Sequence, residues 1–167
     1  MLQETLIEKY PALLIFNADQ KEFCIGIDRI LFISSAQEFV NNLTRFKTTA
    51  LEHCMSELFY VADFNSIFGF TSSNNKGKEK IIFIESDDEN LGVKVESVTE
   101  FIITDKNFFK ESNFIKFRTH NYLRGKILYQ DREFYLPDYD KIISDHKLHI
   151  SSHTKQINRF FVSADLS

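Results

Sequence analysis

The sequence predicts an all-β protein made of two similar halves, and three observations support this. Short apolar runs bounded by turn residues recur along the chain, as expected for strands. One segment occurs twice, as FYVADFNSIF at 59–68 and as FYLPDYDKII at 134–143. The chain has 18 Phe and no Trp, which indicates an aromatic core. At 167 residues it has room for one domain or for two small, closely joined halves.

Nine strands are expected in chain order, each an alternating or continuous apolar run that ends at turn residues. Residues 129–134 have the composition of a hairpin turn, and residues 85–90 that of a longer acidic turn. The acidic turn lacks the glycine and the closing glutamate of an EF-hand loop, so we expect a solvated turn and no Ca²⁺ site. The predicted strands are 12–17, 22–27, 29–34, 58–62, 80–85, 91–96, 98–103, 126–130 and 132–136.

The same order of segments is found in both halves. IGIDRILFI at 25–33 precedes the first copy of the repeated segment, and VKVESVTEFI at 93–102 precedes the second. Each half begins with a strand, a polar turn and a second strand. The spacing of the two copies is too long for a solenoid repeat and suits a small barrel. We therefore expect a domain at 11–145, with halves at 11–72 and 80–145.

Short helices are expected where the repeated segments end. Asp63 and Asp138 each follow a strand, and a carboxylate there can accept hydrogen bonds from the free amides of a helix's first turn. We interpret both as structural caps rather than catalytic acids. Residues 35–58 are ambiguous between a helix and a strand that starts near Leu51, and the tail at 146–167 is expected to be helical.

Composition and charge exclude several classes of function. The net charge is −4 and the isoelectric point about 5.7, which argues against a nucleic-acid binder. The only basic run, at 74–80, is interpreted as a solvated linker. Glu4 and Glu8 stand where a signal peptide would carry basic residues, and the apolar run that follows is too short to span a membrane. We expect a cytoplasmic protein with no membrane insertion and with unpaired cysteines.

The sequence shows no motif for enzyme chemistry. His146, His149 and His153 would share one face of a helix, but two serines weaken that helix and no Cys or Glu lies nearby to complete a metal site. His53 and Cys54 are neighbours, and in a strand they would point to opposite faces. Phosphate-binding, nucleophile-elbow and zinc-protease motifs are absent from the sequence. We therefore expect no catalysis, no metal and no cofactor.

Several segments in order resemble the CheW-like domain, the coupling module of bacterial chemosensory arrays that also ends the CheA histidine kinases. The family's Val-Asp-x-Val strand is matched by Val95-Glu96-Ser97-Val98, and its aromatic-x-Arg-Gly strand by Tyr122, Arg124 and Gly125. Pro137-Asp138-Tyr139 loosely matches its closing Leu-Asp-Leu. Residues 60–64 with Gly69 match the segment that ends the first half.

The resemblance implies two interlocked five-stranded SH3-like barrels with short helices. It also implies two partners, a CheA-type histidine kinase and the cytoplasmic tip of a chemoreceptor. The residues it places at partner surfaces are Ile27, Ile30 and Phe32 in the first half and Val95, Val98 and Arg124 in the second. Gly125 would be structural, because glycine allows a backbone conformation or a close approach that a side chain would obstruct.

One departure from the family pattern bears on function. An Asn-x-Arg-Gly turn usually precedes the first Asp segment, and residues 53–56 are His-Cys-Met-Ser instead. Three hypotheses follow: a chemosensory scaffold, the same fold used for another protein–protein interaction, or an unrelated small β-barrel that binds a small ligand or nucleic acid.

Overall fold

The computed structural model describes residues 11–37, 59–71, 77–85, 90–119 and 122–145. Several predictions fall outside these ranges. They concern the tail at 146–167 with its three histidines, the His53–Cys54 pair, the departure at 53–56, most of the ambiguous segment at 35–58 and most of the acidic turn.

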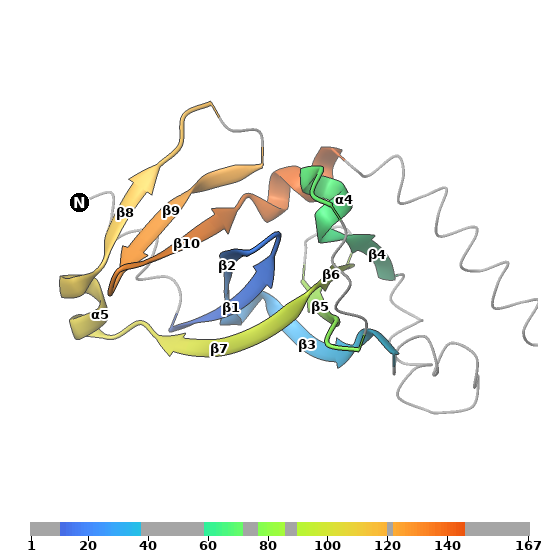
Figure 1. The fold of residues 1–167 in the computed structure, drawn as a ribbon, viewed down its shortest axis with the longest axis horizontal. Coiled ribbons are helices and arrows are strands. Elements are labelled where there is room, and N and C mark those ends of the chain that lie inside the picture. The colour runs from blue at the N-terminus through green and yellow to red at the C-terminus, as the bar shows by residue number, and fades with distance from the viewer. Residues whose placement is uncertain (1–10, 38–58, 72–76, 86–89, 120–121, 146–167) are drawn as a thin grey trace, which may run out of the picture.

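Ten strands and a few short helices make up the described chain (Figure 1). The helical elements are η1 (Ile27–Arg29), α4 (Phe64–Phe68) and α5 (Lys106–Glu111), and residues 139–145 are also helical. The strands are β1 (Ala12–Ala18), β2 (Lys21–Gly26), β3 (Ile30–Ser35), β4 (Phe59–Asp63), β5 (Lys80–Ile84), β6 (Asn90–Val95), β7 (Ser97–Ile103), β8 (Asn113–Lys116), β9 (Leu123–Tyr129) and β10 (Arg132–Pro137).

The strands form two sheets, and each sheet takes strands from both halves of the sequence. The larger has six strands in the order β7-β1-β2-β10-β9-β8, and the smaller has four in the order β3-β5-β6-β4. Most neighbours are antiparallel, whereas β2–β10 and β4–β6 are parallel pairs. Both parallel pairs join a strand of the first half to one of the second. The two halves are therefore interlocked through their hydrogen bonding.

Two tight turns fix the hairpins of the larger sheet. Asp19 and Gln20 join β1 to β2, and Gln130 and Asp131 join β9 to β10. All four residues have positive φ, between 48° and 59°. Two-residue hairpin turns that match the twist of their strands require this backbone conformation, and Asp tolerates it better than most residues do.

The larger sheet is apolar on both faces of its central strands. Leu14 and Phe16 of β1 belong to the core cluster between the two sheets, while Leu13 and Ile15 belong to a second cluster. This second cluster is completed by Phe108 of α5. Burial on both faces explains the continuous apolar run in β1, because a strand with one wet face would alternate apolar and polar residues.

Aromatic rings fill the centre of the core between the sheets. Phe64, the first residue of α4, meets Phe23 edge-on at a centroid distance of 4.7 Å and Phe16 at 5.1 Å. Tyr139 and Ile142 from the helical residues 139–145 belong to the same cluster. The two copies of the repeated segment therefore supply side chains to one shared core.

The prediction of an all-β fold with short helices is confirmed. The division into two closed five-stranded barrels is not: the described strands pair into sheets of six and four. Ile27 was predicted to lie in a strand, but β2 ends at Gly26 and Ile27 begins the 3-10 turn η1. In that turn the Ile30 amide donates to the Ile27 carbonyl, which a strand conformation would prevent. The elements α5 and β8 were not predicted.

Candidate interaction surface

The Arg-Gly step lies in β9, beside the edge strand β8. Gly125 is buried and pairs with Lys116 of β8. A Cβ at position 125 would come within 2.7 and 2.8 Å of two ring atoms of Phe114, and nearer still to the carbonyl oxygen of Ile115. Glycine is required because β8 approaches the backbone here. The preceding Arg124 is exposed, so it lies where a partner could contact it.

Asp63 and Asp138 occupy equivalent positions in the two halves. The Asp63 carboxylate accepts from the Asn65 amide at 3.0 Å and is the N-cap of α4. The Asp138 carboxylate accepts from the Lys141 amide at 3.2 Å, at the start of the helical residues 139–145. Asp63 also forms an ion pair with Lys94, 3.1 Å away in β6. These contacts give both carboxylates a structural function.

The first-half residues predicted at a partner surface lie in η1 and β3, an edge strand of the smaller sheet. Ile27, Ile30 and Phe32 are all half-buried. Ile30 packs against the core between the sheets, and the Phe32 ring stacks on Phe83 at a centroid distance of 4.2 Å. Each therefore keeps part of its surface accessible.

The second-half residues Val95 and Val98 lie on either side of the link between β6 and β7. Val95 is 3% exposed and belongs to the core. A partner cannot reach its side chain in this conformation, so the prediction that Val95 lies at a partner surface is wrong. Val98 is half-buried and also packs against that core.

The structure therefore does not gather all six predicted partner residues into one surface. Ile30, Val95 and Val98 converge on the core between the sheets. Arg124 lies on the larger sheet, and Phe32 lies on the smaller. The candidate surface therefore draws on both sheets, with Phe32 on the smaller and Arg124 on the larger.

Glu96 has a role that its place in the Val-Glu-x-Val motif did not reveal. Its carboxylate is buried, and one oxygen accepts from the backbone amide of Asp19 and from the side-chain amide of Asn65, each at 3.3 Å. Its own amide donates to the Asn17 carbonyl at 3.2 Å. Glu96 thus links the β1–β2 turn to α4. These partners are distant in sequence, so the motif alone carried no signal of them.

Arg132 is the centre of a second set of contacts that was not predicted. Its guanidinium donates two hydrogen bonds to the Glu22 carboxylate, at 2.6 and 3.1 Å, and a further one to Glu100. The hydrogen bonds to Glu22, and then the one to Glu100, raise the pKa of Arg132 above its usual range. These contacts link β10 to β2 and to β7.

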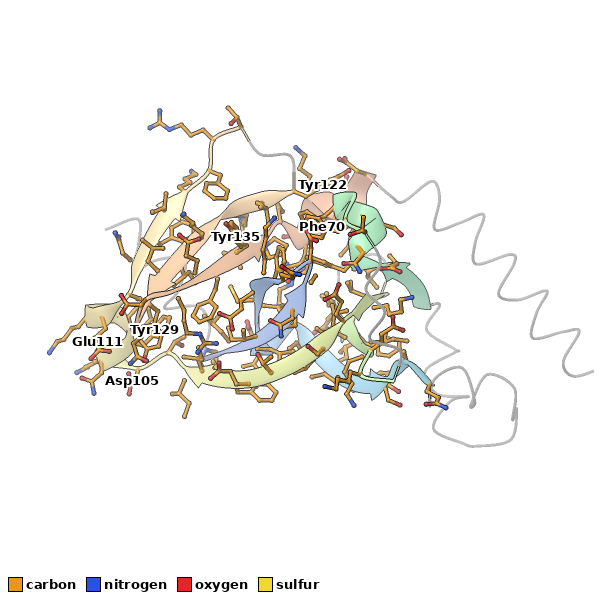
Figure 2. The ribbon with its side chains drawn as sticks, in the orientation of Figure 1. Phe70, Asp105, Glu111, Tyr122, Tyr129 and Tyr135 are labelled. Carbon is orange, nitrogen blue, oxygen red and sulfur yellow. The ribbon has the colours of Figure 1, made fainter. Side chains whose placement is uncertain are left out.

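A group of half-buried aromatic residues lies where α4 meets the larger sheet (Figure 2). Phe70 and Tyr135 both contact the Phe23 ring, at centroid distances of 6.0 and 5.7 Å. The Lys21 ammonium lies 5.2 Å from the centre of the Phe70 ring. Desolvation by burial, and then a hydrogen bond with Asp145, raise the pKa of Tyr122 above its usual value. These rings connect the core to the surface.

The described residues hold neither a metal-binding cluster nor a reactive thiol. They contain no cluster of three or more His, Cys, Asp or Glu that could hold a metal ion. Burial raises the pKa of the Cys24 thiol to about 12, so Cys24 stays protonated and is not a nucleophile. The thiol donates to the Tyr135 carbonyl at 3.6 Å, as expected of a core residue. No helix in the described part of the chain is long and apolar enough to cross a membrane.

Comparison with known proteins agrees with this geometry. The family model of the CheW-like domain matches residues 12–147. Among solved structures, the chain is similar to the scaffolding protein TtCheW from Thermoanaerobacter tengcongensis, with a TM-score of 0.55 and 15% identity. That similarity covers 77% of this chain and 89% of TtCheW, and at this identity it concerns the fold alone. A search of curated proteins finds no match. Since the family match covers most of its length, the chain belongs to the CheW-like domain family.

Proposed function

We propose that the protein is a non-enzymatic adaptor of a bacterial chemosensory two-component system, which couples a CheA-type histidine kinase to chemoreceptor tips. The observation that carries the proposal is the family match over residues 12–147. It is supported by TtCheW, which has a similar fold and is described as a scaffolding protein. An adaptor of this kind acts in the cytoplasm and needs no cofactor.

The finer architecture belongs to the same proposal. The sheets of six and four strands would be the counterparts of the two interlocked SH3-like barrels of the family. The domain would span 11–145, with halves at 11–72 and 80–145 and a separate tail at 146–167.

An adaptor must contact two partners at once, and candidate residues on two different sheets suit that requirement. Arg124 is an exposed cation on the larger sheet, and a guanidinium can bind a carboxylate through two parallel hydrogen bonds. Ile27 and Phe32 offer half-buried apolar surface at η1 and β3. Apolar groups ringed by polar ones suit an apolar helix face, such as that of a receptor hairpin. We assign Arg124 to the kinase and the η1–β3 surface to the receptor.

A binding experiment tests this assignment. The purified protein is titrated with the regulatory domain of the organism's own CheA-type kinase, and Arg124→Ala is compared with Arg118→Ala, which removes another exposed arginine. We expect Arg124→Ala to weaken binding about tenfold while keeping the melting temperature, because hot spots often contain arginine. Arg118→Ala should bind like the wild type. Equal effects of the two variants would contradict the assignment of Arg124.

A second candidate function has a specific observation in its favour. His-Cys-Met-Ser at 53–56 replaces the family's Asn-x-Arg-Gly turn, so a surface that ordinary coupling uses would be altered. The fold would then serve a different protein–protein interaction outside chemosensory arrays. A wild-type protein that binds none of the organism's CheA-type kinases or receptors at tens of micromolar would reject coupling in favour of this alternative.

A further inference from the structure

Strand β7 is an edge of the larger sheet with unusually apolar exposed side chains. It pairs with β1 on one side, and no strand of the described chain pairs with its other side. Ile103 is 72% exposed and Phe101 is 54% exposed, the two highest fractions among the large hydrophobic residues described. Edge strands of this kind are templates for pairing with another chain.

The backbone of β7 is oriented for such pairing. The Thr104 amide donates to the Pro11 carbonyl at 3.1 Å, which places the hydrogen-bonding groups of Thr104 on the side of β1. The register between β1 and β7 is regular from Ile103 to Glu100. Because the direction of these groups alternates along an antiparallel strand, the amides and carbonyls of Phe101 and Ile103 point away from β1. They face the open edge.

The usual protection against pairing is missing from β7. Natural edge strands carry outward lysines, prolines or inward charges that deter another strand. Glu100 is the only charged residue of β7, and it is already paired with Arg132. The opposite edge of the same sheet is different: β8 has four residues, and Lys116 is exposed on it. The open edge of β7 is therefore longer than that of β8, and its one charged side chain is already paired.

We propose that β7 pairs antiparallel with β7 of a second copy of this chain, about a two-fold axis at Ile102. Phe101 then lies opposite Ile103 of the second copy, and each exchanges the backbone hydrogen bonds that point away from β1. Their side chains fall on the same face and form two identical pairs of an aromatic with a β-branched residue, a favourable cross-strand combination. The interface is isologous, as two-fold dimers require.

The pairing of side chains in this register favours a second copy over other occupants. In this register Glu100 lies opposite Thr104 of the second copy, and Asp105 lies opposite Thr99. No like charges meet, and each Glu100 keeps its own Arg132. The strand is thus complementary to itself, whereas a charged peptide would find no partner for its charge among the outward side chains Phe101 and Ile103.

The oligomeric state in solution tests the proposal. In size-exclusion chromatography coupled to light scattering, we expect the full-length protein to have twice the chain mass of 19.6 kDa. On dilution the measured mass should fall to that of one chain. Ile103→Lys should raise the dimer dissociation constant about tenfold or more, because it places two lysines in one apolar interface. The control is Leu31→Lys on the β3 edge, where the leucine is 41% exposed. It should leave the dimer unchanged.

Ile103→Lys is expected to fold, because its side chain is mostly exposed, and Ile103→Thr is a second variant that keeps a β-branched residue. Amide hydrogen exchange supplies an independent reading: the amides of Phe101 and Ile103 should be protected in the concentrated protein and lose protection on dilution. A wild type that stays monomeric throughout the micromolar range would overturn the proposal. So would a dimer that Leu31→Lys disrupts as strongly as Ile103→Lys, or edge protection that appears only with a kinase or receptor present.

Discussion

Replacing Gly125 with alanine should destabilise the protein far more than one added methyl group suggests. The new Cβ would lie 2.7 Å from the Phe114 ring and closer still to the Ile115 carbonyl oxygen. Real Cβ atoms essentially never approach other heavy atoms to within 3.0 Å. The ring could rotate away, but the carbonyl belongs to the backbone of β8. Relief therefore requires β8 to move off β9.

The expected cost follows from this geometry. Overpacking a well-filled site costs about 1–3 kcal/mol, and we expect the upper end because backbone must move. For a domain of this size, about 3 kcal/mol lowers the melting temperature by about 6–12 °C. Gly125→Val, which adds more atoms at the same point, should lower it further or prevent folding. The assay is thermal and urea unfolding followed by circular dichroism.

Gly69→Ala is the matched control for the loss of a glycine. Gly69 has a φ of 69°, and an added Cβ there meets no atom within 4 Å. Its cost comes only from the left-handed backbone, about 1 kcal/mol. If Gly125→Ala destabilised the protein no more than Gly69→Ala, the close approach of β8 to β9 would be wrong as described.

Three further predictions concern the remaining polar groups and the thiol. Asp63→Ala and Asp138→Ala should each lower the free energy of unfolding by about 1 kcal/mol, and full stability with loss of partner binding would contradict the cap assignment. Glu96→Ala should lower the free energy of unfolding by about 1–3 kcal/mol, because the side-chain amide of Asn65 loses its acceptor. Glu96→Gln should lower it less. Equal losses for the two variants in urea unfolding would reject that explanation. The Cys24 pKa is raised from 9.0 to about 12, so its contribution to stability is complete below pH 9 and is lost as pH rises toward 12. Urea unfolding should therefore show that the free energy of unfolding falls less between pH 7 and pH 10.5 for Cys24→Ala than for the wild type. Equal decreases in the two proteins would contradict the raised pKa of Cys24.

Much of the fold could be predicted because it depends on local patterns. Apolar runs and turn residues located nine strands. Helix α5 was missed because six residues are too few to show a helical period. Its one local signal is Asp105, whose carboxylate accepts from the Phe108 amide at 2.9 Å.

The candidate surface was harder to predict than the fold. An apolar residue in a strand can face a core or a partner, and the sequence pattern is the same for both, which explains why Val95 was assigned to the surface. The contacts of Arg132 with Glu22 join residues 110 positions apart in the chain. Such contacts depend on which strands become neighbours, and periodicity within one strand contains no information about that.

The interlocked sheets also constrain how the chain can reach its native state. Strand β1 can complete its hydrogen bonding only after β7 has been synthesised. Strand β2 likewise needs β10, at the far end of the domain. Proteins whose contacts join distant positions fold slowly, since loops must close before those contacts stabilise the structure. Neither half made alone could complete a sheet. Two fragments cut between α4 and β5 should each remain unfolded and regain structure only when mixed. Fused to two other proteins, the fragments could therefore report whether those proteins bind each other.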